Sequence, residues 1–346
     1  MIILNKPLLE KLSNAFGPPG YETEPRNILI EELQDYADEV KTDKLGNVFF
    51  THKGDEKAPV IMLAAHTDEV AVLITDIDDD GFLRFHPWGI VANVLPGQRM
   101  QLNGRKGTLY GILGTKPPHV LSEEERKAAI PADQLFIDIG AKDREMAEAK
   151  GAYIGMTGVF DVQFKDLGDG YLWGKAFDDR VGCYVMAEVF KWAKDKPYNI
   201  VAVGTVQEGV GLRGSKTAAW QVDPDYGLAL ENTFAMDMPG VPPHKQSAGL
   251  QKGPVVTIAD RSVIAHPKVL GCIIEAAEAE SIPYQYKTIP SGGTDAGSIH
   301  LTKAGIPSGT IANPGRYIHG PCGITTEGDI DNTVALVKAF IKRISS

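Results

Sequence analysis

Cysteines and long apolar runs are both scarce in this sequence. Only three cysteines occur among 346 residues, and they provide neither an even disulfide framework nor a CxxC metal-binding pair. We therefore expect a protein of the cytoplasm, which is a reducing compartment. No segment approaches the roughly 20 apolar residues of a membrane helix, and the apolar N-terminal stretch is too short for a signal peptide. We expect no membrane partner.

Basic residues are outnumbered by acidic ones, 35 against 45, so the formal net charge is -10. Such a chain repels nucleic acid unless it carries a local basic patch, and none is visible. The hydrophobic fraction of 43% and the charged fraction of 23% are ordinary for soluble globular proteins. With about 100–200 residues per domain, the length predicts one large domain or two.

The distribution of apolar residues predicts an α/β fold. The expected helices and strands of the main domain are helices over 8–16, 24–36, 179–193, 267–279 and 331–344, and strands over 47–50, 60–65, 200–206, 226–230 and 305–312. Strands that alternate with helices indicate a mostly parallel sheet with helices on both faces.

The pattern of apolar and turn-forming residues changes between about Val70 and Gly158. Short β-rich pieces there are separated by turn dipeptides such as Asp80-Gly81 and Asn103-Gly104. This pattern predicts a small β-rich barrel or sandwich inserted into the main domain. The charged stretch 122–127 is more typical of a solvated helical turn than of a functional loop.

A histidine and an aspartate follow the apolar segment 59–63. His66 and Asp68 emerge where a buried strand is expected to end, and in α/β sheets functional residues gather beyond the carboxyl ends of strands. The same strand-then-ligand pattern recurs at Glu208, Glu231 and His319. Imidazole nitrogen and carboxylate oxygen suit zinc, cobalt or manganese, and the absence of nearby cysteine favours a catalytic ion over a structural one.

Two adjacent aspartates, Asp178 and Asp179, precede an expected helix. Asp178 is able to bridge two ions, which then lie ~3.5–4 Å apart. Either aspartate can also cap the helix, so Asp179 can serve the helix while Asp178 faces the metal. Asp68, on the same face of an extended segment as His66, is a candidate to orient its imidazole.

Glu208 follows a second apolar strand and is a candidate general base, which takes a proton from metal-bound water and passes it to the leaving amine. The glycine-rich continuation over 209–215 lacks the Gly-Lys-Ser/Thr ending of a phosphate-binding loop. We therefore discount phosphate binding.

Taken in order, six short motifs resemble those of the TET-type glutamyl or deblocking aminopeptidases, a family of dinuclear metallopeptidases of which some members are labelled endoglucanases. The matching segments are GPPGYE at 17–22, HTDE at 66–69, GKAFDDRVG at 174–182, VQE at 206–208 with GLRG at 211–214, GGTDAG at 292–297, and RYIH at 316–319. Each motif is weak alone, but six in the same order are specific.

The resemblance implies a site and an architecture. His66, Asp178 and Glu231 would hold one divalent ion, Asp178 and His319 would hold the second, and Asp68 would support His66. Residues 1–68 and 164–346 would form the catalytic domain, and 69–163 an inserted domain used in self-association, often of twelve subunits. Such relatives remove amino-terminal residues from peptides, so peptides are the expected substrates.

The sequence departs from the family pattern at Gly209, where relatives carry a second glutamate that ligates the second ion. Two milder departures are Glu231, where relatives usually have aspartate, and Gly320, where serine is common. We therefore expect a metal-dependent aminopeptidase that binds one or two ions of zinc, cobalt or manganese. A degenerate homologue that binds peptides or acts as a scaffold is the first alternative. A glycosidase is the second, although no aromatic sugar platform is visible.

Overall fold

The computed structural model describes residues 4–90, 92–120, 122–124, 128 and 130–346. The chain separates into two compact units. The first comprises Met1–Asp68, Phe164–Ile318 and Cys322–Ser346, and the second comprises Glu69–Gln163 with His319–Pro321.

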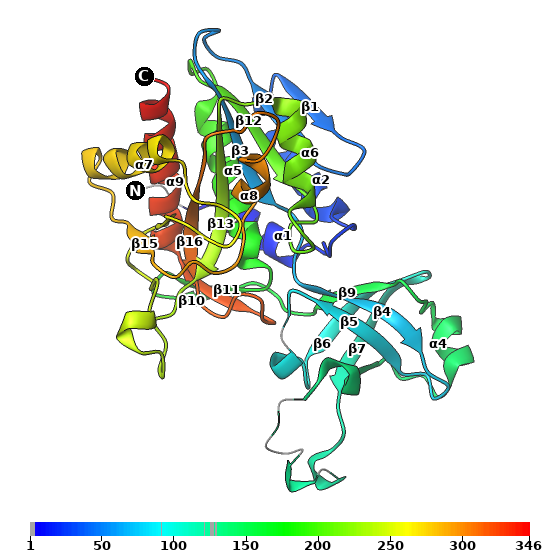
Figure 1. Cartoon of the computed structure of the whole chain (residues 1–346). Coiled ribbons are helices and arrows are strands. Elements are labelled where there is room, and N and C mark those ends of the chain that lie inside the picture. The colour runs from blue at the N-terminus through cyan, green and yellow to red at the C-terminus, as the bar shows by residue number, and fades with distance from the viewer. Residues whose placement is uncertain (1–3, 91, 121, 125–127, 129) are drawn as a thin grey trace. The chain divides into compact units, whose positions relative to one another are not determined.

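An eight-stranded mixed sheet forms the centre of the first unit (Figure 1), in the order β1–β2–β12–β3–β13–β16–β14–β15. The strands are β1 (Glu39–Thr42), β2 (Val48–His52), β3 (Val60–His66), β12 (Asn199–Thr205), β13 (Tyr226–Phe234), β14 (Val255–Thr257), β15 (Gln285–Lys287) and β16 (Ser308–Gly315). The four central strands, β12, β3, β13 and β16, are parallel to one another. Antiparallel β2 and β14 flank them, so the expected α/β class is confirmed.

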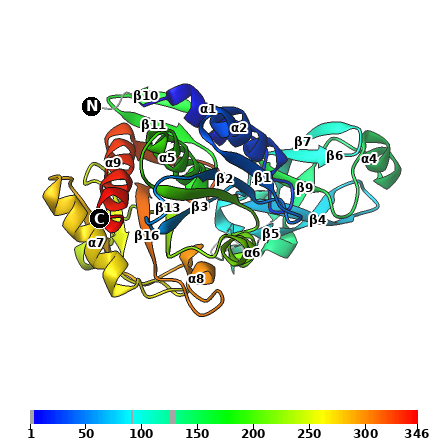
Figure 2. The same ribbon diagram turned by 90° about the horizontal axis from the view of Figure 1, so that it is seen from above.

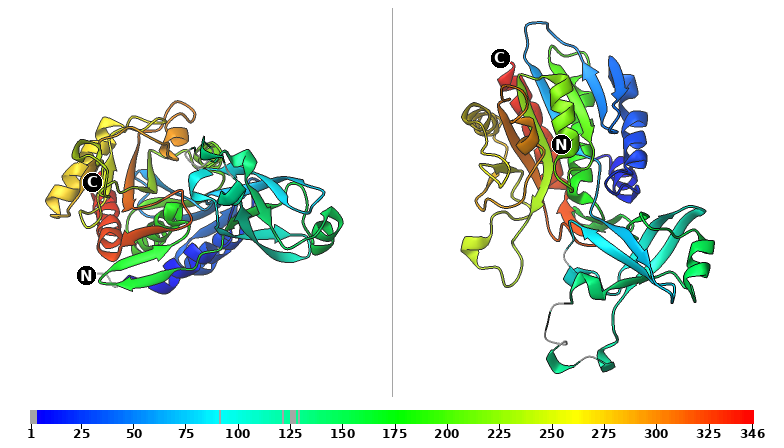
Figure 3. Two further views of the ribbon diagram at one scale, coloured as in Figure 1. Left: turned by 90° about the horizontal axis from the view of Figure 1, so that it is seen from below. Right: turned by 45° about the vertical axis from the view of Figure 1, so that its right-hand side comes forward.

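Helices cover both faces of this sheet (Figure 2). One face packs against α5 (Phe177–Ala193) and α9 (Glu327–Ile344), with α1 (Lys6–Asn14), α2 (Thr23–Leu33) and α7 (Pro267–Ala279) beside them. The other face packs against α6 (Arg213–Val222) and the short α8 (Ala296–Ile299). In Figure 3 the C-terminal helix α9, in red, runs beside α7, in yellow.

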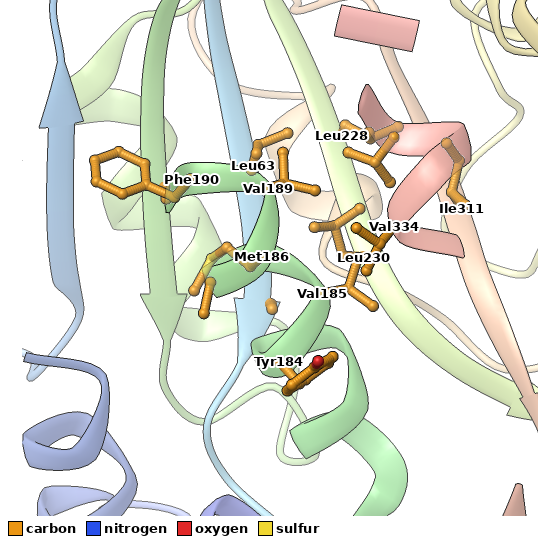
Figure 4. Close-up of a cluster of buried hydrophobic side chains, with 14 of the residues drawn as sticks. Leu63, Tyr184, Val185, Met186, Val189, Phe190, Leu228, Leu230, Ile311 and Val334 are labelled. Atoms are coloured by element: carbon orange, nitrogen blue, oxygen red, sulfur yellow. The ribbon is translucent and has the colours of Figure 1, made fainter. Parts of the chain in front are cut away.

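The alternation of side chains along β3 assigns each residue to one face. Ile61 and Leu63 join the core around α5, where Val185 and Val189 pack against the sheet (Figure 4), whereas Met62 and Ala64 join the core under α6 and α8. Because successive strand residues point to opposite faces, His66 belongs with Met62 and Ala64 on the α6 and α8 side.

The boundaries of the helices follow local capping. The expected helix over 267–279 is observed at the same residues as α7. α9 begins four residues earlier than expected, because the Thr326 hydroxyl accepts a hydrogen bond from the Asp329 N–H and caps it. The expected helix over 24–36 ends at Leu33 and continues only as a 3₁₀ turn, η1 (Gln34–Tyr36).

A small antiparallel sheet completes the unit: β10 (Lys165–Gly168), β11 (Tyr171–Gly174) and β17 (Gly323–Thr326).

The second unit contains a closed six-stranded barrel in the order β4–β5–β8–β7–β6–β9. Its strands are β4 (Ala71–Ile77), β5 (Leu83–Trp88), β6 (Arg99–Gly104), β7 (Gly107–Gly114), β8 (Phe136–Asp138) and β9 (Thr157–Phe160), and helix α4 (Arg144–Lys150) lies between β8 and β9 in sequence. Of the two β-rich forms expected from the sequence, the structure shows the barrel. In the stretch 122–127, residues 123–124 are helical and 125–127 lie outside the described residues. Within the described chain, no helix combines the length and apolar character needed to cross a membrane.

Candidate metal centre

The candidate site lies where β3 and β13 stop pairing. β3 pairs with β13 only over Tyr226–Ala229, whereas β13 continues along β16 as far as Phe234. His66 is the last residue of β3, and Glu231 lies two residues beyond the last pair that β13 makes with β3. The expectation that Glu231 follows the end of a strand is therefore wrong, because pairing with β16 extends β13 past it.

Three carboxylates surround the Nε2 atom of His66. Asp178 Oδ1 lies 3.3 Å from it, and Glu208 Oε2 and Glu231 Oε2 each lie 3.8 Å from it. His66 and Glu231 are buried, and the side chains of Asp178 and Glu208 are each only 14% exposed. Side chains from three separate segments thus converge on the imidazole of a fourth.

The other imidazole nitrogen is held by the main chain. His66 Nδ1 lies 3.1 Å from the backbone carbonyl oxygen of Asp68, and 3.5 Å from the carboxylate oxygen Oδ1 of the same residue. A proton on Nδ1 donated to that carbonyl leaves the Nε2 lone pair directed at the three carboxylates, as metal coordination requires. Asp68 therefore orients His66 mainly through its carbonyl group.

Asp179 has a different environment from Asp178, to which a cis peptide bond joins it. Its Oδ2 accepts the backbone N–H of His66 at 3.2 Å, and its Oδ1 accepts the N–H of Gly182 at 3.0 Å. Its carboxylate still lies close to the cluster, since ligand atoms of His66, Asp179 and Glu231 lie within 4.8 Å of one another. Asp179 thus ties the start of α5 to the end of β3.

Burial and mutual repulsion shift the protonation of these groups. Burial raises the pKa of Glu208 to about 8. His66 opposes this shift, whereas the carboxylates of Asp295 and Asp68 add to it. Burial also raises the pKa of Glu231 and of Asp179 well above the ordinary range. Burial alone lowers the pKa of His66, but Glu208, Asp178 and Asp68 outweigh it and raise that pKa. Such crowding of anions is the environment that a cation relieves.

Gly182 provides the space that Asp179 occupies. A Cβ atom at position 182 would lie 2.3 and 2.4 Å from the two carboxylate oxygens of Asp179, and 2.5 Å from the carbonyl oxygen of Leu230. We expect Gly182→Ala to lower the free energy of unfolding by about 1–3 kcal/mol through overpacking, measured by urea denaturation.

The control for this variant is Gly271→Ala in α7, where a Cβ would meet nothing within 4 Å. That substitution is expected to raise the free energy of unfolding by roughly 0.5–1 kcal/mol, as for any unhindered helical glycine. Equal stability of the two variants would contradict the packing described for Asp179.

Both carboxylate oxygens of Asp68 bind the loop that carries Glu208. Oδ1 accepts the N–H of Glu208 at 2.9 Å, and Oδ2 accepts the N–H of Gly209 at 3.0 Å. The Asp68 carboxylate, which we expected to orient His66, therefore also fixes the backbone of Glu208, the candidate base.

One buried carboxylate near the site had no role from the sequence. Asp295 lies in the GGTDAG motif, its N–H donates to Glu231 Oε1 at 3.2 Å, and its Oδ2 accepts from Thr205 Oγ1 at 2.5 Å. In the sequence, only its place in the GGTDAG motif pointed to Asp295, because Glu231 and Thr205 lie 64 and 90 residues away along the chain.

His319 groups with the second unit and is exposed, so its role as a ligand stays a prediction.

Comparison with known proteins defines the class. The model of the family "M42 glutamyl aminopeptidase" matches residues 46–336. The lysyl aminopeptidase of Pyrococcus furiosus is 34% identical over 344 residues, which cover 97% of this chain and 96% of that protein. Among solved structures, a TET aminopeptidase from Thaumarchaeota archaeon SCGC AB-539-E09 is 42% identical with a TM-score of 0.94, covering 98% of this chain and 96% of its own. PhTET1-12s, a dodecamer in its asymmetric unit, is 30% identical with a TM-score of 0.86 and 99% coverage of both chains.

The family model, the curated relative and the structure at 42% identity are all described as aminopeptidases, whereas one other similar structure, from Thermotoga maritima and 29% identical with a TM-score of 0.79, is titled an endoglucanase. The chain belongs to the M42 glutamyl aminopeptidase family. The resemblance inferred from the six motifs is thereby confirmed, and the comparisons favour the peptidase interpretation over the glycosidase one.

Proposed function

We propose that this protein is a metal-dependent aminopeptidase whose ion is held by His66, Asp178 and Glu231. The convergence of these residues around His66 Nε2 carries the proposal. The donor set fits a divalent ion such as zinc, cobalt or manganese, since it offers one imidazole nitrogen and buried carboxylate oxygens. Asp178 is assigned as the ligand in preference to Asp179, because its Oδ1 lies 3.3 Å from His66 Nε2, whereas the oxygens of Asp179 are engaged by the backbone N–H groups of His66 and Gly182.

A divalent ion bound here would polarise the first peptide carbonyl of the substrate and acidify a water molecule. Glu208 would accept the proton of that water on its carboxylate and then donate it to the leaving amine. The position of Glu208 supports this exchange, since its Oε2 atom lies 3.8 Å from His66 Nε2, next to the atoms that would hold the ion. Asp68 would hold His66 and the Glu208 backbone in place.

The site lacks one of the ligands that the resemblance implies for a second ion. Gly209 offers no side chain where the resemblance places a ligand, so the protein would bind one ion firmly and the second weakly or not at all. This observation also favours the second candidate function, a degenerate homologue that binds peptides without cleaving them efficiently.

We extend the proposal to self-association. PhTET1-12s is a dodecamer, and the barrel of this chain exposes the apolar side chains of Tyr110 and Ile112 on β7 and of Ile154 before β9. Large apolar side chains left exposed on a folded unit are candidates for burial in a protein interface. The oligomer would be assembled through this inserted domain.

The function is tested with unblocked aminoacyl p-nitroanilides and short peptides. Protein stripped with a chelator and reloaded with zinc, cobalt or manganese is expected to release amino acids one at a time from the amino terminus, and the chelated protein is expected to be inactive. A cyclic peptide of the same sequence, which has no amino terminus, is the control and should not be cleaved. Peptide binding without cleavage under every metal would instead support the degenerate homologue.

A further inference from the structure

The GPPGYE motif at 17–22 has no role in the site described so far, yet it reaches the loop that carries Glu208. Glu22, its last residue, is buried at 4% exposure. Its Oε1 atom accepts the N–H of Gly20 at 2.7 Å and the N–H of Gln207 at 3.1 Å. The motif is therefore linked by a buried carboxylate to the residue directly before the candidate base.

Side chains accept every backbone N–H of this loop from 206 to 209. Val206 donates to Asn47 Oδ1 at 3.1 Å, Gln207 donates to Glu22, and Glu208 and Gly209 donate to the two oxygens of Asp68. Asn47, Glu22 and Asp68 are all buried. The loop thus leaves β12 with its N–H groups bonded to side chains instead of to another strand.

The backbone of the loop needs such support. Gln207 has a φ of 57°, in the left-handed region that residues with a side chain seldom adopt. Residues in that region persist when the surrounding contacts over-determine them, and they cluster at functional sites. The carbonyl and side-chain oxygens of Gln207 accept hydrogen bonds from Arg213, and its N–H donates to Glu22. The bond to Glu22 holds the peptide group on the side of the β12 end, two residues before the Glu208 side chain.

We infer that Glu22 is a positioning residue for catalysis, which fixes the Glu208 carboxylate by holding the Gln207 peptide group. The inference rests on the proposed role of Glu208 as general base and goes beyond it. Misplacing a catalytic group by about 1 Å can reduce the rate about 10²-fold, so the effect falls on kcat. Substrate and metal ligands are untouched, so KM and metal content stay the same.

The test compares three variants of Glu22 with a matched control in the metal-loaded full-length protein. Glu22→Ala removes the carboxylate that accepts the Gln207 N–H, and Glu22→Asp draws it back by the length of one methylene group. Both variants are expected to lower kcat by about ten- to hundredfold, with KM within twofold of the wild type. Glu22→Gln keeps a carbonyl oxygen at the same position and is expected to recover most of kcat. Glu24→Ala is the control, because Glu24 in the same segment accepts the N–H of Phe16 at 2.8 Å, and within the described part of the chain no hydrogen bond joins its side chain to the loop.

Metal content by elemental analysis and melting temperature accompany the kinetics. A wild-type kcat in Glu22→Asp would overturn the inference, and this variant decides the matter if Glu22→Ala does not fold. Parallel losses of kcat and metal content in Glu22→Ala and Glu24→Ala would also overturn it, since they indicate a general structural role. If Glu208→Gln kept the wild-type kcat, both the role of Glu208 as general base and the role of Glu22 would be contradicted. If Glu208→Gln lost kcat but Glu22→Asp did not, only the role of Glu22 would be contradicted.

Discussion

Glu208→Gln is expected to lower kcat by about 10²–10⁴-fold, the usual contribution of a positioned general base. Glutamine keeps the size and the backbone hydrogen bonds of the loop, but its amide cannot accept the proton of the attacking water. KM and metal content should change little, because Glu208 is not among the assigned ligands. Steady-state kinetics on the best p-nitroanilide substrate, together with elemental analysis, measure both quantities.

The control for this variant is Glu275→Gln, since Glu275 lies exposed on α7 in an ion pair with Arg343. Its kcat should equal that of the wild type. If Glu208→Gln also kept the wild-type kcat, proton transfer would have to be assigned to another group.

Gly209→Glu is expected to raise the number of bound ions from one to two per chain and to raise kcat by at least about tenfold, which corresponds to ~1.4 kcal/mol. The substitution is sterically feasible, because a Cβ at position 209 would meet only Asp68 Oδ2 at 3.4 Å. Gly209 is also exposed, and its φ lies outside the left-handed region. A carboxylate there would supply the ligand that the family pattern contains.

Gly209→Gln provides the matched control, with nearly the same length and no charge. It should bind one ion and keep the wild-type kcat. If Gly209→Glu gained neither an ion nor activity, the natural protein would have an alternative to the second ion, and the interpretation of a damaged site would be wrong.

The sequence predicted the elements that carry the site better than it predicted the contacts between them. The apolar runs before His66 and Glu208 located β3 and β12 to within a residue or two, because buried parallel strands are continuously hydrophobic. β13 was expected to end at residue 230, but it continues to Phe234. Its length is set by pairing with β16, which lies some 80 residues later and leaves no local signal.

The roles within the cluster depend on distant partners in the same way. Local sequence allowed Asp178 and Asp179 to be either ligands or caps, and only the bonds from His66 and Gly182 distinguish Asp179. Asp68 was expected beside His66, but its attachment to the Glu208 loop joins residues 140 positions apart. Glu22 was visible only as part of a motif. Spacing along one chain segment cannot predict such bonds, because tertiary folding creates them.

The most direct test of the central claim is the metal content of the wild-type protein, which is also the reference for Gly209→Glu. Protein equilibrated with an excess of zinc, cobalt or manganese and then dialysed should retain one ion per chain by elemental analysis. His66→Ala, lacking the imidazole on which the carboxylates converge, should retain none. Wild-type protein that retains no ion, or a His66→Ala variant that binds as much as the wild type, would contradict the assignment of this cluster as a metal centre.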